Sequence, residues 1–334
     1  MRIAVIGATG VVGQQVLALL AQRDDIDGEQ LRLVATEASA GAEVDFGEDV
    51  LPVEAIGPRT FQGVHAAILA VPPSAARTLA SQAQQSGAWA VDCSGAFRVD
   101  TTVPLVSPGL NDTVLDRPFA GRVVSLAAPV TQGLAEVLEP LRVQYGLVLA
   151  DATVLLGAAT LGRAGVERFS RQTAELLNGK EPDIEIFPHR LGFNLIPAVG
   201  DFDDRGRSQA ERTLLVEAAR LWEGTAMPAL TATALFVPTY HAAMVVISAH
   251  LKRPLDVETL RAVLKAQAGL KVIDDPGSNV YPMPMLNTDD PAVHVGRIRA
   301  FGEHVQLVFT VDPVVRMADA AIDVALELAA RSVE

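Results

Sequence analysis

The sequence contains a single cysteine, Cys93, in 334 residues, so no disulfide can form within the chain. Such sparse cysteine fits a reducing compartment. No apolar run approaches the roughly 18 residues that a membrane span needs. The apolar run after Met1 is broken by Gly7, which makes it too short for the core of a signal peptide. We therefore expect a soluble, cytoplasmic protein without a membrane segment.

Basic residues are also scarce. The sequence has 27 Lys and Arg against 40 Asp and Glu, which gives a formal net charge of −13. A nucleic-acid backbone would be repelled by this charge, so nucleic acid is not an expected partner. No block of like charges stands out, which favours a solvated acidic surface over an interaction tail. The histidines do not cluster at metal-ligand spacing, so we predict no metal.

The chain is long enough for two domains, and its first half alternates short apolar runs with helical stretches. This alternation predicts a parallel sheet with helices on both faces. The predicted strands are 2–6, 31–35, 66–71, 89–92 and 122–128, and the predicted helices are 11–22 and 74–86.

From about residue 147 the predicted strands become longer and the pattern changes to mixed α+β. This pattern favours a more antiparallel sheet, whose faces commonly serve dimer contacts, so we expect a homodimer. The predicted strands are 147–156, 229–237, 243–250 and 305–312, and the predicted helices are 164–178, 208–222, 256–268 and 317–331.

A glycine-rich turn, G-x-x-G-x-x-G, joins the first predicted strand to the first predicted helix. A glycine there lets the backbone approach a pyrophosphate, and the helix N-terminus offers free N–H groups. The alternative to nucleotide binding is that these glycines serve only a tight connection between the strand and the helix. The candidate dinucleotide-binding residues are Gly7, Thr9, Gly10, Val11, Val12 and Gly13.

The second predicted strand ends in Thr36, Glu37, Ala38 and Ser39. An acidic residue at this place can bind a ribose 2′-hydroxyl, whereas an arginine accommodates a 2′-phosphate. Glu37 is present and no arginine is, which favours NAD over NADP. Glu37 is equally compatible with an exposed loop carboxylate. We add Thr36, Glu37 and Ser39 to the candidate cofactor-binding residues.

Several segments, in this order and at this spacing, resemble the aspartate-semialdehyde dehydrogenase family along nearly the whole chain. The resemblance implies a Rossmann-type domain of residues 1–128 and 314–334. It also implies an α+β substrate and dimerisation domain of residues 129–313, like the C-terminal domain of glyceraldehyde-3-phosphate dehydrogenase. The segments are Gly7–Gly13, Ser39–Gly41, Val91–Arg98, Val103–Val106, Asn111, Gln172, Leu177–Gly179, Phe187–His189, Phe193–Pro197 and Val295–Arg299.

The family oxidises an aldehyde through a cysteine thiolate, and the resemblance places that cysteine at Pro129. Proline has no nucleophilic atom, although it suits the first turn of a helix, where its missing N–H costs nothing. Cys93 stands after a different strand, and a lone buried cysteine is usually a small hydrophobe. Thr131 and Ser125 are nearby hydroxyls that would need a dedicated base. The family's nucleophile is therefore absent.

Other positions depart from the family as well. Its substrate glutamine falls at Leu156, its substrate arginine near Ala234, and its arginine for the 2′-phosphate at Ala38. Its phosphate lysine falls near Thr213 beside Arg212, its substrate-orienting carboxylate near Ala210 beside Glu211, and the asparagine of a D-N pair at Pro313 after Asp312. Arg212 and Glu211 are thus substitute candidates for phosphate and substrate binding.

Two family positions are retained, Arg98 for phosphate and His241 for acid–base chemistry. Arg98 is equally compatible with pairing to a carboxylate at the domain junction, and His241 with a hydrogen-bonded residue at the start of a strand.

The pattern resembles the Usg-type paralogues of the family, which keep the fold without the cysteine. It leaves three hypotheses: a non-catalytic dimeric protein that still binds a nucleotide or metabolite, an NAD(P)-dependent oxidoreductase acting on another carbonyl without a thiol, and a partner that modulates an active homologue.

Overall fold

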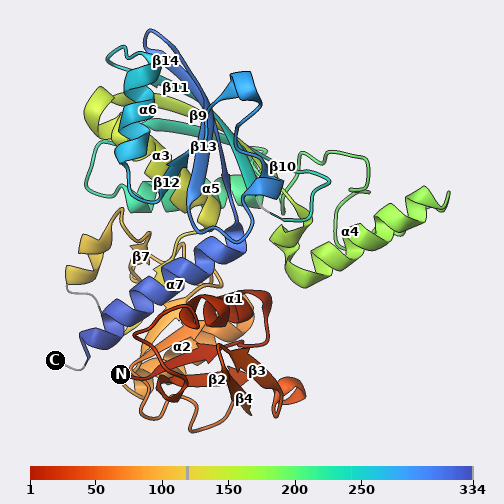
Figure 1. Cartoon of the computed structure of the whole chain (residues 1–334), viewed down its shortest axis with the longest axis vertical. Helices are drawn as coiled ribbons and strands as arrows, with labels where there is room; N and C mark the ends of the chain where they lie inside the picture. The colour runs from red at the N-terminus through yellow and green to blue at the C-terminus, as the bar shows by residue number, and fades with distance from the viewer. Residues whose placement is uncertain (118–119, 242, 333–334) are drawn as a thin grey trace. The chain divides into compact units, whose positions relative to one another are not determined.

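The structure is a computed structural model that describes residues 1–117, 120–241 and 243–332. The chain divides into two compact units. The first comprises Met1–Ala128 and Val314–Glu334, and the second comprises Pro129–Pro313. Each unit contains its own sheet, and each is described by itself (Figure 1).

The first unit is built on an eight-stranded sheet in the order β3-β4-β2-β1-β5-β6-β8-β7. All neighbouring strands are parallel except β3 and β4, which form an antiparallel hairpin at one edge. Its strands are β1 (Ile3–Ile6), β2 (Leu31–Ala35), β3 (Glu43–Phe46), β4 (Asp49–Ala55), β5 (Ala66–Leu69), β6 (Trp89–Asp92), β7 (Leu105–Val106) and β8 (Val123–Leu126).

Helices cover both faces of this sheet. Helices α1 (Val11–Leu20) and α7 (Pro313–Ala330) join β1 residues such as Val5 in one apolar cluster. Helix α2 (Pro73–Gln85) packs with the oppositely directed Ile6 in another. Strands β1 and β5 are wholly buried because both of their faces are covered, as expected for continuous apolar runs in a parallel sheet.

The second unit is built on a six-stranded mixed sheet in the order β10-β9-β11-β14-β13-β12. Its three central pairs are antiparallel, and the two outer pairs are parallel. The strands are β9 (Leu147–Leu156), β10 (Ala229–Phe236), β11 (Ala243–Leu251), β12 (Leu270–Val272), β13 (Val293–Phe301) and β14 (His304–Val311). The helices are α3 (Pro129–Tyr145), α4 (Gly162–Leu177), α5 (Gln209–Leu221) and α6 (Val257–Ala266).

The predicted fold class, a Rossmann-type α/β domain followed by an α+β domain, is confirmed. The predicted strands and helices occur within a few residues of their expected bounds, and β6 and β9 match them. The hairpin β3–β4 and strands β7, β12 and β13 were not predicted. Strand β13 lacks a regular alternation because Gly296 and the positive-φ residue Arg297 lie at a register shift.

Among the residues that the structure describes, no helix combines the length and apolarity needed to cross a bilayer. Within residues 1–117, 120–241 and 243–332, no three His, Cys, Asp or Glu side chains are grouped so as to hold a metal ion.

Candidate functional site

The glycine loop joins β1 to α1 in the middle of the parallel sheet. The chain leaves β1 between its neighbours β2 and β5, the kind of position at which α/β sheets bind ligands beyond the strands' carboxyl ends. The N–H groups of Gly7 and Ala8 donate to the carbonyl of Val34, at 2.8 and 3.2 Å. These bonds fix the loop to the end of β2.

The loop requires glycine at two of its positions because a side chain there would overlap the backbone. Gly7 has φ +89°, and a Cβ there would lie 2.2 Å from the carbonyl oxygen of Ala70. A Cβ on Gly13 would lie 2.2 Å from the carbonyl oxygen of Gly7. Both positions are therefore dictated by close packing of the loop against itself and against the chain after β5.

Gly10 is the N-cap of α1, where φ is −78° and no side chain caps the helix. Its own N–H donates to the carbonyl of Gly7 at 2.9 Å, and Gly10 and Val11 are exposed. The first turn of α1 thus presents backbone N–H groups without a side-chain cap at a glycine-lined surface. That arrangement is what an anionic pyrophosphate requires.

The end of β2 carries the predicted ribose-binding residues. Thr36 precedes a short 3₁₀ turn of Glu37–Ser39, and its side chain does not cap that turn. Thr36 and Glu37 are exposed, Ser39 is half-buried, and the Glu37 carboxylate has no hydrogen-bond partner among the described residues. The end of β2 therefore presents the Glu37 carboxylate, and residues 36–39 contain no arginine.

Arg98 lies in the loop after β6 and ties two strand ends together. Its Nε donates to the carbonyl of Leu126 at 2.9 Å, and its Nη2 donates to the carbonyl of Cys93 at 3.2 Å. The guanidinium also packs over Gly95, whose φ is +85° and where a Cβ would come within 3.0–3.3 Å of it. Arg98 is half-buried and held at the carboxyl ends of β6 and β8.

Asp92 organises the same loop, and sequence reasoning did not single it out. The carboxylate is fully buried and accepts hydrogen bonds from the N–H and hydroxyl of Ser94. The Ser125 hydroxyl also donates to it, at 3.0 Å. The available signal was an aspartate as the last residue of a buried apolar strand, where a charge needs several donors.

The hydroxyl and thiol candidates for a nucleophile are buried. Pro129, at the position that the resemblance gives to the cysteine, is the first residue of α3. Burial, with the nearby Asp92 carboxylate, raises the pKa of the Cys93 thiol far above its ordinary value. Ser125 and Thr131 are at most 1% exposed. None of these three side chains is presented as a reactive thiolate or alkoxide.

His241 follows β10 in the second unit and is exposed. Its ring lies 6.3 Å from that of Tyr240, and it forms no hydrogen bond with a described residue. The loop before it is fixed to the end of β9, since the N–H groups of Ala158 and Ala159 donate to the carbonyls of Thr239 and Tyr240. Leu156, the last residue of β9, is 8% exposed. The structure thus brings Leu156 and the His241 loop together.

Both carboxylate oxygens of Glu211 accept hydrogen bonds from the backbone. One carboxylate oxygen accepts from the N–H of Ser208 at 2.7 Å in a capping box at the start of α5. The other accepts from the N–H of Ala234 in β10 at 2.9 Å. Glu211 is 8% exposed, and one of its two backbone partners is Ala234, near which the resemblance places the family's arginine.

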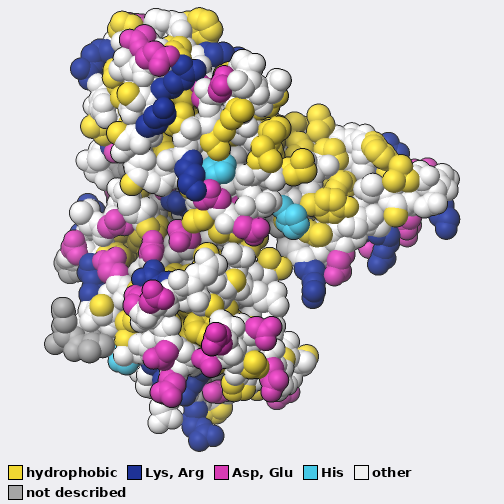
Figure 2. Space-filling view, in the orientation of Figure 1, with side chains coloured by type: hydrophobic (Ala, Val, Ile, Leu, Met, Phe, Trp, Pro, Cys, Tyr) yellow, Lys and Arg dark blue, Asp and Glu magenta, His cyan; other side chains and the backbone are white. Residues whose placement is uncertain are grey.

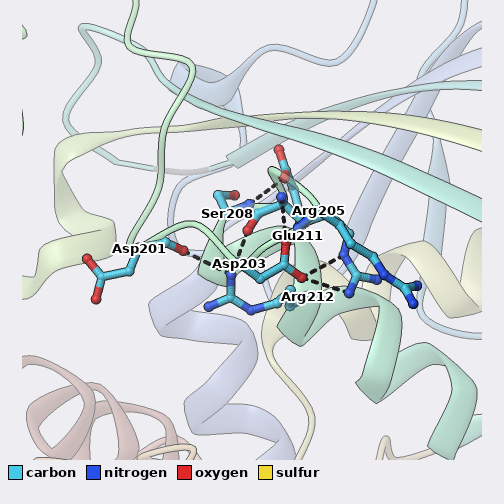
Figure 3. A network of polar contacts seen from close by, with 7 residues as sticks. Asp201, Asp203, Arg205, Ser208, Glu211 and Arg212 are labelled. Carbon is cyan, nitrogen blue, oxygen red and sulfur yellow. Dashed lines mark hydrogen bonds and ion pairs between the residues drawn. The ribbon is translucent and has the colours of Figure 1, made fainter.

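Arg212 anchors the turn that precedes α5 (Figure 3). Its Nη1 donates to the carbonyls of Asp201 and Arg207, at 3.0 and 2.6 Å. The backbone N–H of Arg207 donates to the Asp203 carboxylate at 2.8 Å, and the Arg207 guanidinium pairs with it at 2.7 Å. These bonds, the backbone one first, lower the pKa of Asp203 to about 2. One terminal nitrogen of the Arg212 guanidinium is therefore used by the protein backbone.

Two family models cover most of the chain. The model described as "Semialdehyde dehydrogenase, NAD binding domain" matches residues 2–117, and "Semialdehyde dehydrogenase, dimerisation domain" matches residues 138–316. The chain belongs to the semialdehyde dehydrogenase family.

Individual members of the family are similar to this chain over most of their length. Aspartate-semialdehyde dehydrogenase of Bacillus subtilis is 32% identical over 90% of this chain and 88% of its own. A "USG-1 protein homolog" of Azotobacter vinelandii is 33% identical over 89% and 87%. A solved structure of a probable aspartate-semialdehyde dehydrogenase from Pseudomonas aeruginosa has a TM-score of 0.88 at 30% identity and covers 96% of each chain.

The two matched family models correspond to the two units of the structure. The first unit carries an NAD(P)-binding domain, and the glycine loop lies in it. The second carries a dimerisation domain, and His241, Glu211 and Arg212 lie in it. The expected resemblance is confirmed at the level of the family.

Proposed function

We propose that this chain is a homodimeric, dinucleotide-binding member of the family that does not catalyse the phosphate-dependent oxidation of aspartate semialdehyde. The observation that carries the proposal is the lack of a cysteine at the expected position of the nucleophile. The chain has one cysteine, Cys93, buried after β6, while Pro129 opens the helix at which the family's nucleophile is expected.

Other replacements support the same proposal. Leu156 and Ala234 offer no polar atom where the resemblance places a glutamine and an arginine for the substrate. The Glu211 carboxylate is occupied by two backbone N–H groups. Loss of several groups that act together on one transition state is rarely compensated by a single neighbour. Selection for this reaction is therefore expected to have lapsed.

Cofactor binding has independent support in the geometry of the first unit. The uncapped first turn of α1 would hold the pyrophosphate of NAD, with Gly7, Thr9, Gly10, Val11, Val12 and Gly13 forming the loop around it. Glu37 would accept from the ribose 2′-hydroxyl, with Thr36 and Ser39 beside it. When bound, NAD supplies a hydride acceptor. We propose NAD over NADP because Ala38 stands where an arginine would receive the 2′-phosphate.

A titration with NAD and NADP tests the cofactor part. We expect saturable calorimetric binding of NAD and weaker binding of NADP, and a Glu37→Ala variant that loses most of the difference between them. Absence of binding of either nucleotide at millimolar concentration would remove the cofactor from the proposal.

The second candidate is an oxidoreductase that acts on another carbonyl compound. It is favoured by His241, which is exposed on a fixed loop, and by Arg98, which is held at the carboxyl ends of β6 and β8. Thiol-free hydride transfer needs a cofactor, a positioned carbonyl and a proton relay. Nucleotide oxidation or reduction during a screen of small aldehydes and ketones, lost in His241→Ala, would favour this candidate over the first.

A further inference from the structure

Tyr240 and His241 present their rings side by side on the loop after β10. Neighbouring residues of an extended chain normally point to opposite sides. Here the two ring centroids lie 6.3 Å apart, and the ring planes are tilted by only 32°. Tyr240 is 41% exposed, and His241 is exposed as well. A phenol and an imidazole therefore meet solvent together on one side of this loop.

Helix α4 holds the Tyr240 ring in place. Phe169 packs edge-on against it, with the ring centroids 4.8 Å apart and the planes at 61°, an arrangement that aromatic rings prefer. The Ser170 hydroxyl donates to the phenol oxygen at 3.3 Å. A tyrosine hydroxyl both accepts and donates hydrogen bonds. Because no described residue accepts the phenol hydrogen, it is left to donate to a bound molecule.

His241 is the second hydrogen-bonding group of this pair. Neither ring nitrogen bonds to a described residue. The loop is fixed to the chain after β9, since the N–H of Ala159 donates to the carbonyl of Tyr240 at 2.9 Å. An imidazole ring offers donors and, when neutral, an acceptor. The phenol and the imidazole can therefore bind the oxygen of one carbonyl or hydroxyl group together.

The chain around this pair carries no formal charge. Residues 152–162 and 224–251 contain no Lys, Arg, Asp or Glu, although such residues make up 20% of the sequence. These segments include the end of β9 and the whole of β10 and β11. A charged ligand would therefore find no ion-pair partner on them.

The arginines of α4 do not supply such a partner either. Arg163 and Arg168 each pair with a glutamate, at 3.5 and 3.6 Å. Arg171 follows Phe169 by two residues, which places it about 200° around the helix. Its side chain therefore leaves the helix on the side away from the ring that contacts Tyr240.

The neighbouring side chains are apolar. Leu156, at the end of β9, is 8% exposed, and its carbonyl accepts from the N–H of Val237, three residues before Tyr240. Figure 2 shows hydrophobic side chains gathered over and beside α4, the helix that carries Phe169. A ligand bound to Tyr240 through one oxygen would therefore have apolar groups close to its remaining atoms.

We propose that Tyr240 and His241 form a binding site for a small uncharged carbonyl compound, or the corresponding alcohol, with an apolar and planar remainder. The ligand's oxygen accepts from the phenol hydroxyl and bonds to the imidazole, and its apolar part lies against the exposed Tyr240 ring. This inference goes beyond the proposed cofactor site, because it concerns the second unit alone. If the protein is the oxidoreductase of the second candidate, a compound of this class is its expected substrate.

A ligand-observed NMR titration with acetophenone tests this assignment, and benzoate serves as the charged compound of similar size and shape. We expect acetophenone to bind with a dissociation constant in the millimolar range, as for a ligand of its size. Benzoate should bind at least about tenfold more weakly, because its carboxylate loses water without gaining a cation.

Tyr240→Phe removes the hydroxyl but keeps the ring and its packing on Phe169. The dissociation constant of this variant for acetophenone should rise about fivefold, the effect of one lost hydrogen bond. His241→Ala should weaken binding at least as much. The matched control is Tyr145→Phe, because Tyr145 ends α3 and its ring lies 6.0 Å from the Arg253 guanidinium. This control should bind acetophenone as the wild type does.

The outcomes separate the ligand class from the site. Benzoate that binds as tightly as acetophenone would refute the uncharged class of ligand. The site itself would be refuted if acetophenone showed no binding at tens of millimolar, or if Tyr240→Phe bound it as tightly as Tyr145→Phe. Either result leaves the cofactor proposal standing, because NAD binding is measured separately at the glycine loop.

Discussion

Replacing Gly10 by alanine separates the cofactor-binding role of the glycine loop from its structural role. The backbone at Gly10, with φ −78° and ψ 165°, is open to alanine. An added Cβ would lie 3.2 Å from the carbonyl oxygen of Gly7, a contact that a shift of a few tenths of an ångström relieves. Alanine is a poorer N-cap than glycine, but it reduces the entropy of the unfolded chain, and each effect is about 0.5–1 kcal/mol with opposite sign. We expect the free energy of unfolding to change by less than about 1 kcal/mol.

The same methyl group should weaken NAD binding at least about tenfold, because it occupies space beside the N–H groups of the first turn of α1. Calorimetric titration of Gly10→Ala with NAD, beside thermal unfolding followed by circular dichroism, measures both effects. If this variant binds NAD as tightly as the wild type, the pyrophosphate does not lie on this loop.

Gly7→Ala is the contrasting control. It adds a left-handed penalty of about 1–2 kcal/mol at φ +89°. Overlap with the carbonyl oxygen of Ala70, 2.2 Å from the new Cβ, adds about 1–3 kcal/mol. A total of about 2–5 kcal/mol lowers the unfolding midpoint by roughly 4–20 °C. An unfolding midpoint equal to that of the wild type would contradict the close packing described for this turn.

Three further predictions concern the nucleophile position, the cysteine and an ion-pair network. Pro129→Cys should not restore oxidation of aspartate semialdehyde in a phosphate-dependent assay, since Leu156 and Ala234 still lack polar groups for the substrate; turnover above the wild-type level would show that the thiol was the one missing group. Cys93 should react with an aromatic disulfide reagent at pH 8 much more slowly in the native protein than after denaturation, because burial raises its pKa; equal rates would contradict its burial. Burial works to raise the pKa of Asp290, but hydrogen bonds from Lys271 and His294 lower it to about 2, from 3.8. Because the pKa is lower in the folded state, the ionised carboxylate stabilises the protein above the unfolded pKa of 3.8. This stabilisation is lost as pH falls through about 2. The stability gap between wild type and Asp290→Asn, about 1–2 kcal/mol near neutral pH, should therefore shrink between pH 4 and pH 2 in urea unfolding, and a gap independent of pH would refute the ion-pair account.

The sequence predicts most of this fold because local patterns and tertiary packing agree. Strand β1 and helix α1 are an apolar run and an amphipathic stretch on either side of a glycine turn, and both bury the faces that the pattern indicates. Strand β13 was not predicted because its alternation is interrupted at Gly296 and Arg297, where the register shifts. Helix α7 begins four residues earlier than expected, at Pro313, since proline suits the first position of a helix.

The candidate site was less predictable because residue type does not reveal what a side chain contacts. Glu211 and Arg212 have suitable chemistry for substrate and phosphate, but both Glu211 oxygens and Nη1 of Arg212 form hydrogen bonds with the backbone of the second unit. Asp92 is visible in the sequence only as the last residue of a strand, and its set of donors comes from a loop and a neighbouring strand. By contrast, the roles of Gly7 and Gly13 follow from sterics at a turn whose spacing the sequence displays.

The most direct test of the proposed loss of activity is a steady-state assay with NAD or NADP, phosphate and aspartate semialdehyde. The protein should be purified from a host that lacks its own aspartate-semialdehyde dehydrogenase. We predict no nucleotide reduction above the enzyme-free rate, even at cofactor concentrations that saturate binding. Sustained, phosphate-dependent turnover that scales with protein concentration would contradict the proposal and show that the reaction proceeds without a thiol at Pro129.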